Sequence, residues 1–166
     1  MLHKVFTYTD YEGNEKTLDA YFNLSKNDCI DLDRAFEEEG GLISYLTSLI
    51  KDSKEHPDEP PKDTFVRFVR VLVSKAYGIR PKDDPSLFLK EDDYGRSYAQ
   101  KFRGTPAYDN FVFDLLTGKE SLNDFADNIL PNMDENQKEE AQKILMEQGI
   151  DMRELSAQAD GLTVIK

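Results

Sequence analysis

The stretch Leu18-Asp19-Ala20-Tyr21-Phe22-Asn23-Leu24-Ser25-Lys26-Asn27-Asp28 changes its hydrophobic period at Ser25. Upstream of Ser25, apolar side chains occupy every second position: Leu18, Ala20, Phe22 and Leu24. This period of two predicts a strand with one buried face. At the change itself, Ser25 and Asp28 have the spacing of a capping box, which marks the start of a helix. The stretch therefore predicts a strand that runs directly into a helix.

A second strand precedes this one and should pair with it. Residues 3–9 also alternate, and the segment Tyr11-Glu12-Gly13-Asn14-Glu15 supplies turn-forming Gly and Asn. We expect a β-hairpin over residues 3–24, with these side chains on its buried face: Phe6, Tyr8, Leu18, Ala20 and Phe22. Because an isolated hairpin is only marginally stable in water, this face should pack on helices.

Two helices should follow the hairpin. The first carries Cys29, Ile30, Leu32 and Phe36 at helical spacing and should end at Gly40-Gly41. The second carries one apolar stripe, formed by Leu42, Tyr45, Leu46, Leu49 and Ile50. Residues 55–62 contain three prolines among charged residues, so they predict an exposed linker.

The segment from Phe65 to Tyr77 is the most apolar of the chain and rich in β-branched residues, so a strand is possible. Polar residues nevertheless recur there at steps of three and four: Arg67, Arg70, Ser74 and Lys75. This spacing favours a largely buried helix ended by Gly78. Farther along, Asp92 is a possible cap for a helix with aromatic residues four apart: Tyr94, Tyr98 and Phe102.

Two regular amphipathic helices complete the first part of the chain. One should begin at Thr105-Pro106, with Thr as the N-cap and Pro at the first helical position. Its apolar stripe consists of Tyr108, Phe111, Val112, Leu115 and Leu116. The other should begin after Ser121, stop at Pro131 and bury Leu122, Phe125, Ala126, Ile129 and Leu130. Two such helices in sequence predict a packed pair.

The composition changes at residue 131. All ten Phe and eight Tyr lie at or before it, whereas three of the four Met lie after it. We therefore predict a mainly α fold in which the hairpin packs on a compact bundle of about five to six helices over residues 1–131. Residues 132–166 should form an aromatic-free helical appendage.

The net charge and the Cys content exclude several functional classes. A formal charge of −12 in 166 residues disfavours binding to nucleic acid and to anionic lipid. The single Cys29 excludes an intramolecular disulfide. No apolar run is long enough to span a bilayer, and the first residues lack the apolar core of a secretory signal. We expect a cytoplasmic protein without membrane contact.

The residues that carry enzyme chemistry are scarce. The two histidines, His3 and His56, lie at the N-terminus and in the proline-rich linker, and Cys29 falls on a predicted buried stripe. These residues form no zinc signature, and the chain contains no calcium-loop or phosphate-binding glycine motif. We therefore predict no catalytic residue, no metal site and no cofactor, which leaves protein recognition as the leading class.

Two features could serve recognition. Phe113 lies off the buried stripe of its helix, so a single contact face cannot bury both the stripe and Phe113. Phe113 could therefore bind a partner protein or pack on a second helix. The methionines of the appendage, Met133, Met146 and Met152, could offer an adaptable apolar surface or take part in ordinary helix packing.

The order of these segments resembles the siphophage tail assembly chaperone family over about residues 4–131. The N-terminal matches are Tyr21 to Ser25 and then Gly40, Gly41, Leu42, Tyr45 and Leu46. The central matches are Lys75-Ala76-Tyr77-Gly78, Asp83-Asp84, Phe88 and Lys90. The last matches are Phe102, Thr105, Ala107-Tyr108, Leu115-Leu116, Phe125 and Ile129-Leu130-Pro131. Pro81, Pro85 and Arg103-Gly104 depart from the pattern and affect the expected loop conformation.

The resemblance implies a non-enzymatic helper of tail construction. It would bind the tape measure protein and tail tube subunits in the host cytoplasm, could form a homo-oligomer, and would not remain in the mature virion. A different class of protein, an acidic DNA mimic that inhibits a host nucleic-acid enzyme, is the alternative that the charge excess suggests. Such a mimic needs carboxylates spaced like phosphates along one surface, whereas here they are spread through every segment.

Overall fold

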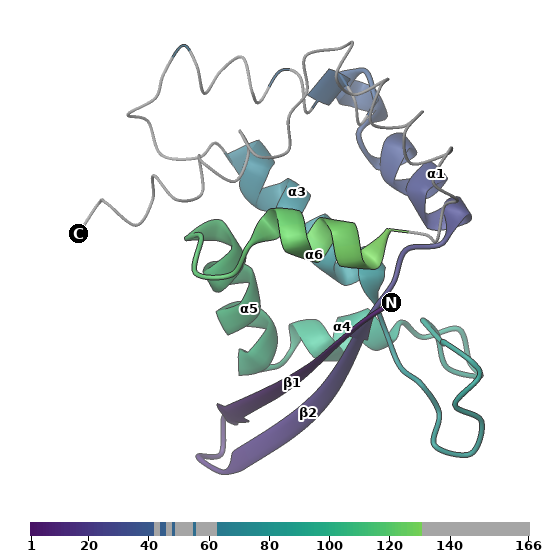
Figure 1. Cartoon of the computed structure of the whole chain (residues 1–166), viewed down its shortest axis with the longest axis vertical. Helices are drawn as coiled ribbons and strands as arrows, with labels where there is room; N and C mark the ends of the chain where they lie inside the picture. Colours follow the sequence, from purple (N-terminus) through teal and green to yellow (C-terminus); the bar gives the residue numbers. More distant parts are fainter. Residues whose placement is uncertain (42–43, 46–47, 49–54, 56–62, 131–166) are drawn as a thin grey trace.

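A computed structural model of the chain describes residues 1–41, 44–45, 48, 55 and 63–130. Among these residues it contains a three-stranded antiparallel sheet, five α-helices and one short 3-10 helix. In Figure 1 the helices α3 to α6 lie on one side of the long hairpin, and α1 continues from its second strand. The described part is therefore a mixed α/β arrangement.

The predicted hairpin is confirmed. Strand β1 (Leu2–Thr9) pairs with β2 (Glu15–Phe22) from Leu2↔Phe22 to Thr9↔Glu15. At the turn, the carboxylate of Asp10 accepts the backbone N–H of Glu12 at 2.9 Å and of Asn14 at 2.8 Å. Gly13 has a φ of 88°, a backbone conformation that residues with a side chain rarely adopt. The buried face contains the residues that alternation predicts, with Ala20 and Phe22 fully buried.

A third strand was not predicted. Strand β3 (Tyr77–Gly78) pairs with β2 at Tyr21 and Phe22, which gives the order β1-β2-β3. Gly78 is the second residue after α3, but its φ is not positive, so it is not the helix-capping glycine that the sequence predicted. A Cβ there would lie 2.5 Å from the ring of Phe88 and 2.7 Å from the carbonyl oxygen of Leu89. Close packing by the loop after β3 requires this glycine.

Most helix starts match the predictions, but the first helix ends at Ala35, before Gly40-Gly41, and the helix expected after Asp92 begins only at Tyr98. Their bounds are α1 Lys26–Ala35, η1 Glu37–Glu39, α3 Asp63–Ala76, α4 Tyr98–Arg103, α5 Pro106–Leu116 and α6 Leu122–Ile129. Ser25 and Asp28 form the predicted capping box of α1. Thr105 and Ser121 cap α5 and α6 as expected, each accepting a backbone N–H three residues later. Local side-chain chemistry therefore determines where these helices start.

Some residue assignments were wrong. Ile30 is 53% exposed and Leu130 44% exposed, although both were placed on buried stripes. Asp92 does not cap α4; its carboxylate accepts the N–H groups of Tyr94 and Arg96 and forms a turn. Most of the predicted second helix, residues 56–62 of the predicted linker and the whole appendage 132–166 lie outside the described residues.

The core is organised around the ring of Phe22. Phe22 is fully buried and its ring centroid lies 5.4 to 6.5 Å from those of five other rings: Phe6, Tyr77, Phe102, Phe111 and Phe125. These partners come from β1, β3, α4, α5 and α6. The two residues after Phe22 add backbone bonds, because Asn23 donates to Ala76 at 2.8 Å and Leu24 donates to Ile129 at 2.7 Å. The end of β2 thus joins nearly every described element.

A partly buried ion pair anchors the long loop between β3 and α4. The Lys90 ammonium donates to Asp28 at 2.6 Å and to the carbonyl of Lys75 at 2.5 Å. Burial by itself raises the pKa of Asp28, but hydrogen bonds from Lys90 and Ser25 outweigh burial and hold that pKa below its ordinary value. Lys90 therefore ties the loop to the capping box of α1 and to the end of α3.

We expect Phe22→Ala to lower the free energy of unfolding by about 3–5 kcal/mol, because the cavity would remove contacts to five rings at once. Urea denaturation followed by circular dichroism measures this. Tyr11→Ala, at the 77% exposed hairpin tip, is the control and should change stability by no more than about 0.5 kcal/mol. Equal effects of the two substitutions would show that Phe22 is not central.

We expect Lys90→Met to lower the free energy of unfolding at pH 7 by about 1–3 kcal/mol, because Asp28 loses its cation while remaining partly buried. The pKa of Asp28 is lowered by folding, so the stability from its charged form is present above its unfolded pKa and is lost as pH falls through its folded pKa. The difference between Lys90→Met and wild type should accordingly shrink at low pH.

Chemical denaturation at a series of pH values tests this dependence. Lys101→Met, which removes an exposed lysine of α4, is the control and should follow the wild type at every pH. If the loss of unfolding free energy in Lys90→Met stayed constant below the folded pKa of Asp28, the Lys90–Asp28 ion pair would not be the source of that loss.

Candidate protein-binding groove

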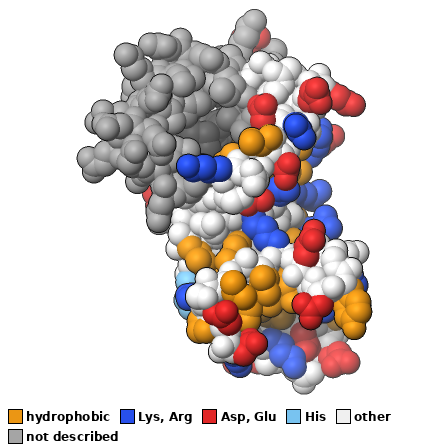
Figure 2. Space-filling model, turned by 90° about the vertical axis from the view of Figure 1, so that its right-hand side faces the viewer, with side chains coloured by type: hydrophobic (Ala, Val, Ile, Leu, Met, Phe, Trp, Pro, Cys, Tyr) orange, Lys and Arg blue, Asp and Glu red, His pale blue; other side chains and the backbone are white. Residues whose placement is uncertain are grey.

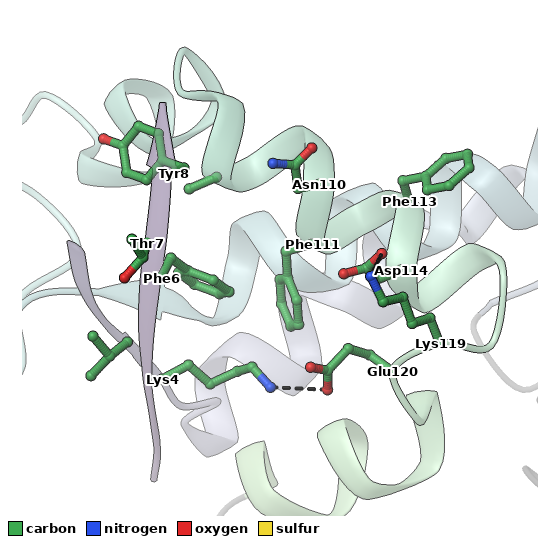
Figure 3. A pocket seen from close by; sticks show the side chains of 12 residues that line it. Lys4, Phe6, Thr7, Tyr8, Asn110, Phe111, Phe113, Asp114, Lys119 and Glu120 are labelled. Carbon is green, nitrogen blue, oxygen red and sulfur yellow. Dashed lines mark hydrogen bonds and ion pairs between the residues drawn. The ribbon is translucent and has the colours of Figure 1, made fainter. Parts of the chain in front are cut away.

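An open groove of about 710 Å³ lies between β1 and α5. We call it the β1–α5 groove; Figure 3 shows the side chains around it. Strand β1 contributes Lys4, Val5, Phe6, Thr7 and Tyr8; α5 contributes Ala107, Asn110, Phe111, Phe113 and Asp114; the turn after α5 contributes Lys119 and Glu120. The groove is a hollow between a strand and a helix, not an enclosed cavity.

The aromatic side of the groove continues into the core. The rings of Phe6 and Phe111 lie 5.2 Å apart, and Phe111 is buried with only 2% exposure. The Lys4 ammonium lies 5.3 Å from the centre of the Phe111 ring, within the range of a cation–π contact. This part of the groove is therefore held in place by the core.

The turn after α5 brings a carboxylate opposite Lys4. Gly118 has a φ of 75°, and the chain folds back so that the N–H of Glu120 donates to the carbonyl of Asp114 at 3.0 Å. The Glu120 carboxylate then pairs with Lys4 at 2.9 Å, drawn as a dashed line in Figure 3. Both side chains are partly exposed, so the pair contributes at most about 1 kcal/mol to stability. Its main effect is to hold the end of the groove in one geometry.

Phe113 stands on the exposed side of the same helix. Its side chain is 64% exposed, and in Figure 3 it points away from Phe6 and Phe111, beside Asp114. The prediction that Phe113 lies off the buried stripe is confirmed, and none of the described helices covers it. Val5 of β1, also on the groove, is 56% exposed. Both side chains thus remain in contact with water, Phe113 on the side of α5 and Val5 on the outer face of the sheet.

The other reactive residues lie away from this groove or inside the fold. His3 pairs with Asp19 at 2.9 Å and stacks on Tyr21 at 4.4 Å between ring centres. Cys29 is half-buried against the core, and burial raises the pKa of its thiol. Among the described residues, no three His, Cys, Asp or Glu side chains gather as metal ligands would. Met133, Met146, Met152 and His56 lie outside the described part of the chain.

A second exposed surface surrounds the loop between β3 and α4. Leu87 is 46% exposed and Tyr94 is 84% exposed, and the Arg96 guanidinium lies 5.2 Å from the Tyr94 ring. Figure 2 shows hydrophobic side chains gathered in the lower half of one face, with Lys, Arg, Asp and Glu between and around them. Charged side chains thus interrupt the apolar part of this surface.

Sequence reasoning found Phe113 but missed the rest of the groove. Lys4 and Val5 were treated only as members of an alternating strand, and Glu120 was not considered. Lys4 gives one usable signal, because a charged residue occupies the inward register of an otherwise apolar strand face. Such a residue usually has a partner. The identity of that partner, Glu120, follows only from the fold.

The comparisons with known proteins give one significant match. A family model described as phage tail assembly chaperone matches residues 1–163. This range extends beyond residues 4–131, over which the sequence resemblance was found. No curated protein sequence and no solved structure gives a significant match. Within the described ranges, none of the helices combines the length and hydrophobicity needed to cross a bilayer.

The two phenylalanines of α5 give a matched test of this geometry. We expect Phe111→Ser to lower the thermal midpoint by many degrees, because Phe111 is buried and a large core truncation costs about 3–5 kcal/mol. Phe113→Ser should leave the midpoint within a few degrees of the wild type, because Phe113 is already exposed. Differential scanning calorimetry measures both. A large fall for Phe113→Ser would mean that Phe113 belongs to the core.

Proposed function

The chain belongs to the phage tail assembly chaperone family, and from this premise we propose that it binds the tape measure protein during tail construction. The family acts in assembly and not in catalysis. The tape measure protein is the client that the resemblance implies. Tail tube subunits are proposed as further clients, and the bound state is proposed to end before the virion matures, in the host cytoplasm.

One observation carries the proposal: Phe113 is exposed at the edge of a groove whose other side is rigid. Covering an exposed Phe side chain completely contributes about 1.5–3 kcal/mol to association. Phe111, two residues earlier on the buried side of α5, and Phe6 opposite it hold the helix and the strand in place. A client side chain would therefore meet a preformed surface, so little ordering of the chaperone opposes binding.

The charge of the chain supports reversible binding. A net charge of −12 keeps molecules with exposed apolar residues apart by mutual repulsion, which opposes aggregation. It also favours neutral or basic clients over acidic ones. A chaperone must release its client to the growing tail, and an open groove whose charged residues already pair with each other suits weak and replaceable binding.

The DNA-mimic alternative receives no comparable support. Several carboxylates in the described part have lysine partners: Asp28 pairs with Lys90, Asp31 with Lys75, and Glu120 with Lys4. Paired carboxylates do not present the free, regularly spaced charge that imitates a phosphate backbone. The family match also favours tail assembly. We therefore keep the chaperone as the proposed function.

Further roles are proposed for parts that the structure does not describe. The division into a chaperone domain at 1–131 and an appendage at 132–166 stays a prediction, as does client contact by Met133, Met146 and Met152. Self-association of the folded part likewise stays a proposal, because the structure contains one chain.

Co-expression with the tape measure protein of the same phage tests the proposal. We expect the wild-type chain to keep that protein soluble and to co-purify with it. Phe113→Ser should weaken the complex about tenfold or more, because binding loses about 1.5–3 kcal/mol of apolar burial. Ile30→Ser, which changes a 53% exposed residue of α1, is the matched control and should bind like the wild type.

Failure of the wild-type chain to change the solubility of the tape measure protein, or to co-purify with it, would remove the proposed function. Equal binding by Phe113→Ser and the wild type would instead remove Phe113 from the contact surface and leave the chaperone role standing.

A further inference from the structure

The outer edge of β1 carries backbone groups that point away from the sheet. At the hairpin end, Asp10 donates its N–H to the carbonyl of Asn14 at 2.8 Å. Hydrogen-bonded pairs in an antiparallel ladder recur at every second residue. In this register the residues bonded to β2 are Leu2, Lys4, Phe6 and Tyr8. The N–H and C=O groups of the alternate residues His3, Val5, Thr7 and Thr9 therefore point outward.

The far side of β2 confirms this alternation. Tyr21, which is opposite His3, pairs with Gly78 of β3, and Asn23 donates to Ala76 on the same side. Odd-numbered residues of β2 thus point toward β3, and even-numbered residues point toward β1. The same parity places the free groups of Val5 and Thr7 on the outer edge of β1.

This edge is open and borders the groove. The sheet order β1-β2-β3 leaves β1 without a neighbouring strand on its outer side among the described residues. Within the same part of the chain, neither Val5 nor Thr7 makes a backbone hydrogen bond on that side. The groove is lined by every residue from Lys4 to Tyr8, including those that face opposite sides of the sheet. A hollow with such a lining runs along the edge of the strand and not only over one face.

We infer that the edge of β1 binds an extended segment of a client protein as an added strand. Unpaired N–H and C=O groups in a row at the spacing of a strand match an extended chain and do not match a helix, whose backbone groups are already bonded to each other. This inference rests on the proposed function and specifies how one client segment is bound. The client is thus a protein that presents a strand, in addition to any apolar helix that covers Phe113.

The surroundings also restrict the side chains of that strand. On the outer face its residues would lie beside Val5 and Thr7, where β-branched side chains pack well. On the groove side they would meet Phe113 and Asp114. The two charge pairs on the groove, Lys4–Glu120 and Lys119–Asp114, cancel, while the whole chain carries −12. A neutral or basic segment with alternating apolar residues therefore fits, and an acidic one does not.

Proline substitution at two facing threonines tests the inference. Thr7 and Thr17 lie directly opposite each other, and the outward N–H of Thr17 points to the other edge of the hairpin, where β3 pairs only with Tyr21 and Phe22. Proline is tolerated at edge positions whose N–H is not bonded within the sheet. Thr7→Pro removes one donor that an added strand needs and obstructs its approach. Thr17→Pro makes the same chemical change without touching the groove.

The tape measure protein and the tail tube subunit are each co-expressed with the wild type, Thr7→Pro and Thr17→Pro, and the captured client is quantified. We expect Thr7→Pro to weaken capture of at least one client about tenfold or more, because an added strand loses backbone hydrogen bonds. Thr17→Pro should capture it like the wild type. Circular dichroism and thermal midpoints check that both variants are folded. If Thr7→Pro does not fold, hydrogen exchange of the wild-type chain with and without client tests the inference instead.

Hydrogen exchange in the wild-type complex gives a readout that does not depend on a variant. The amides of Val5 and Thr7 should exchange rapidly in the chain alone and become protected when the client is bound. Unchanged exchange at both amides, or equal capture by folded Thr7→Pro and the wild type, would overturn the inference while leaving the chaperone role intact. Capture of neither client by the wild type would overturn both. The wild type could also self-associate through this edge. If Thr7→Pro converted such an oligomer to monomers and left client capture unchanged, the edge would bind a second copy of the chain, and the inference would be overturned as well.

Discussion

The packing of Phe22 is the contact on which the rest of the structure depends. A single buried ring touches aromatic partners from β1, β3, α4, α5 and α6, and the next two residues form backbone bonds to the ends of α3 and α6. A two-stranded hairpin has too little buried surface to be stable alone. Because β2 ends in this cluster, the hairpin obtains its buried face from the helices, and the helices obtain a common surface to pack on.

The same arrangement leaves one side of the hairpin exposed. Strand β2 is central in the sheet, with β1 on one side and the short β3 on the other. The helices cover the inner face through Phe6 and Phe22, so within the described part of the chain β1 keeps a backbone edge without a neighbouring strand and an exposed row of side chains. Long exposed edges are a risk for aggregation, and proteins usually protect them. Here the edge borders a groove and an exposed phenylalanine, which is consistent with a surface used for binding.

The described charged residues show how this fold is held together around an exposed surface. Some charged residues join parts of the fold that are far apart in the sequence: Lys90 ties a long loop to Asp28, and Lys4 faces Glu120 across the groove. A chaperone of tail assembly needs a surface that is apolar enough to bind and open enough to release. In the function that we propose, Phe113 would bind a client by covering apolar area and the β1 edge by backbone hydrogen bonding.

Local patterns in the sequence were sufficient for the hairpin, for the caps at Ser25, Thr105 and Ser121, and for the position of Phe113 off the buried stripe. Each of these depends on residues close together in the chain, where alternation, helical spacing and side-chain capping act directly. Tertiary structure alone decided that Tyr77 and Gly78 form a strand, that Ile30 faces water, and that Lys4 meets Glu120. The two-residue strand β3 exists only because β2 lies beside it. A helix with several apolar residues, such as α1 with Ile30, buries only those that face the core. The groove depends on β1 and α5, which are far apart in the sequence, so its shape was determined by packing and not by any local motif.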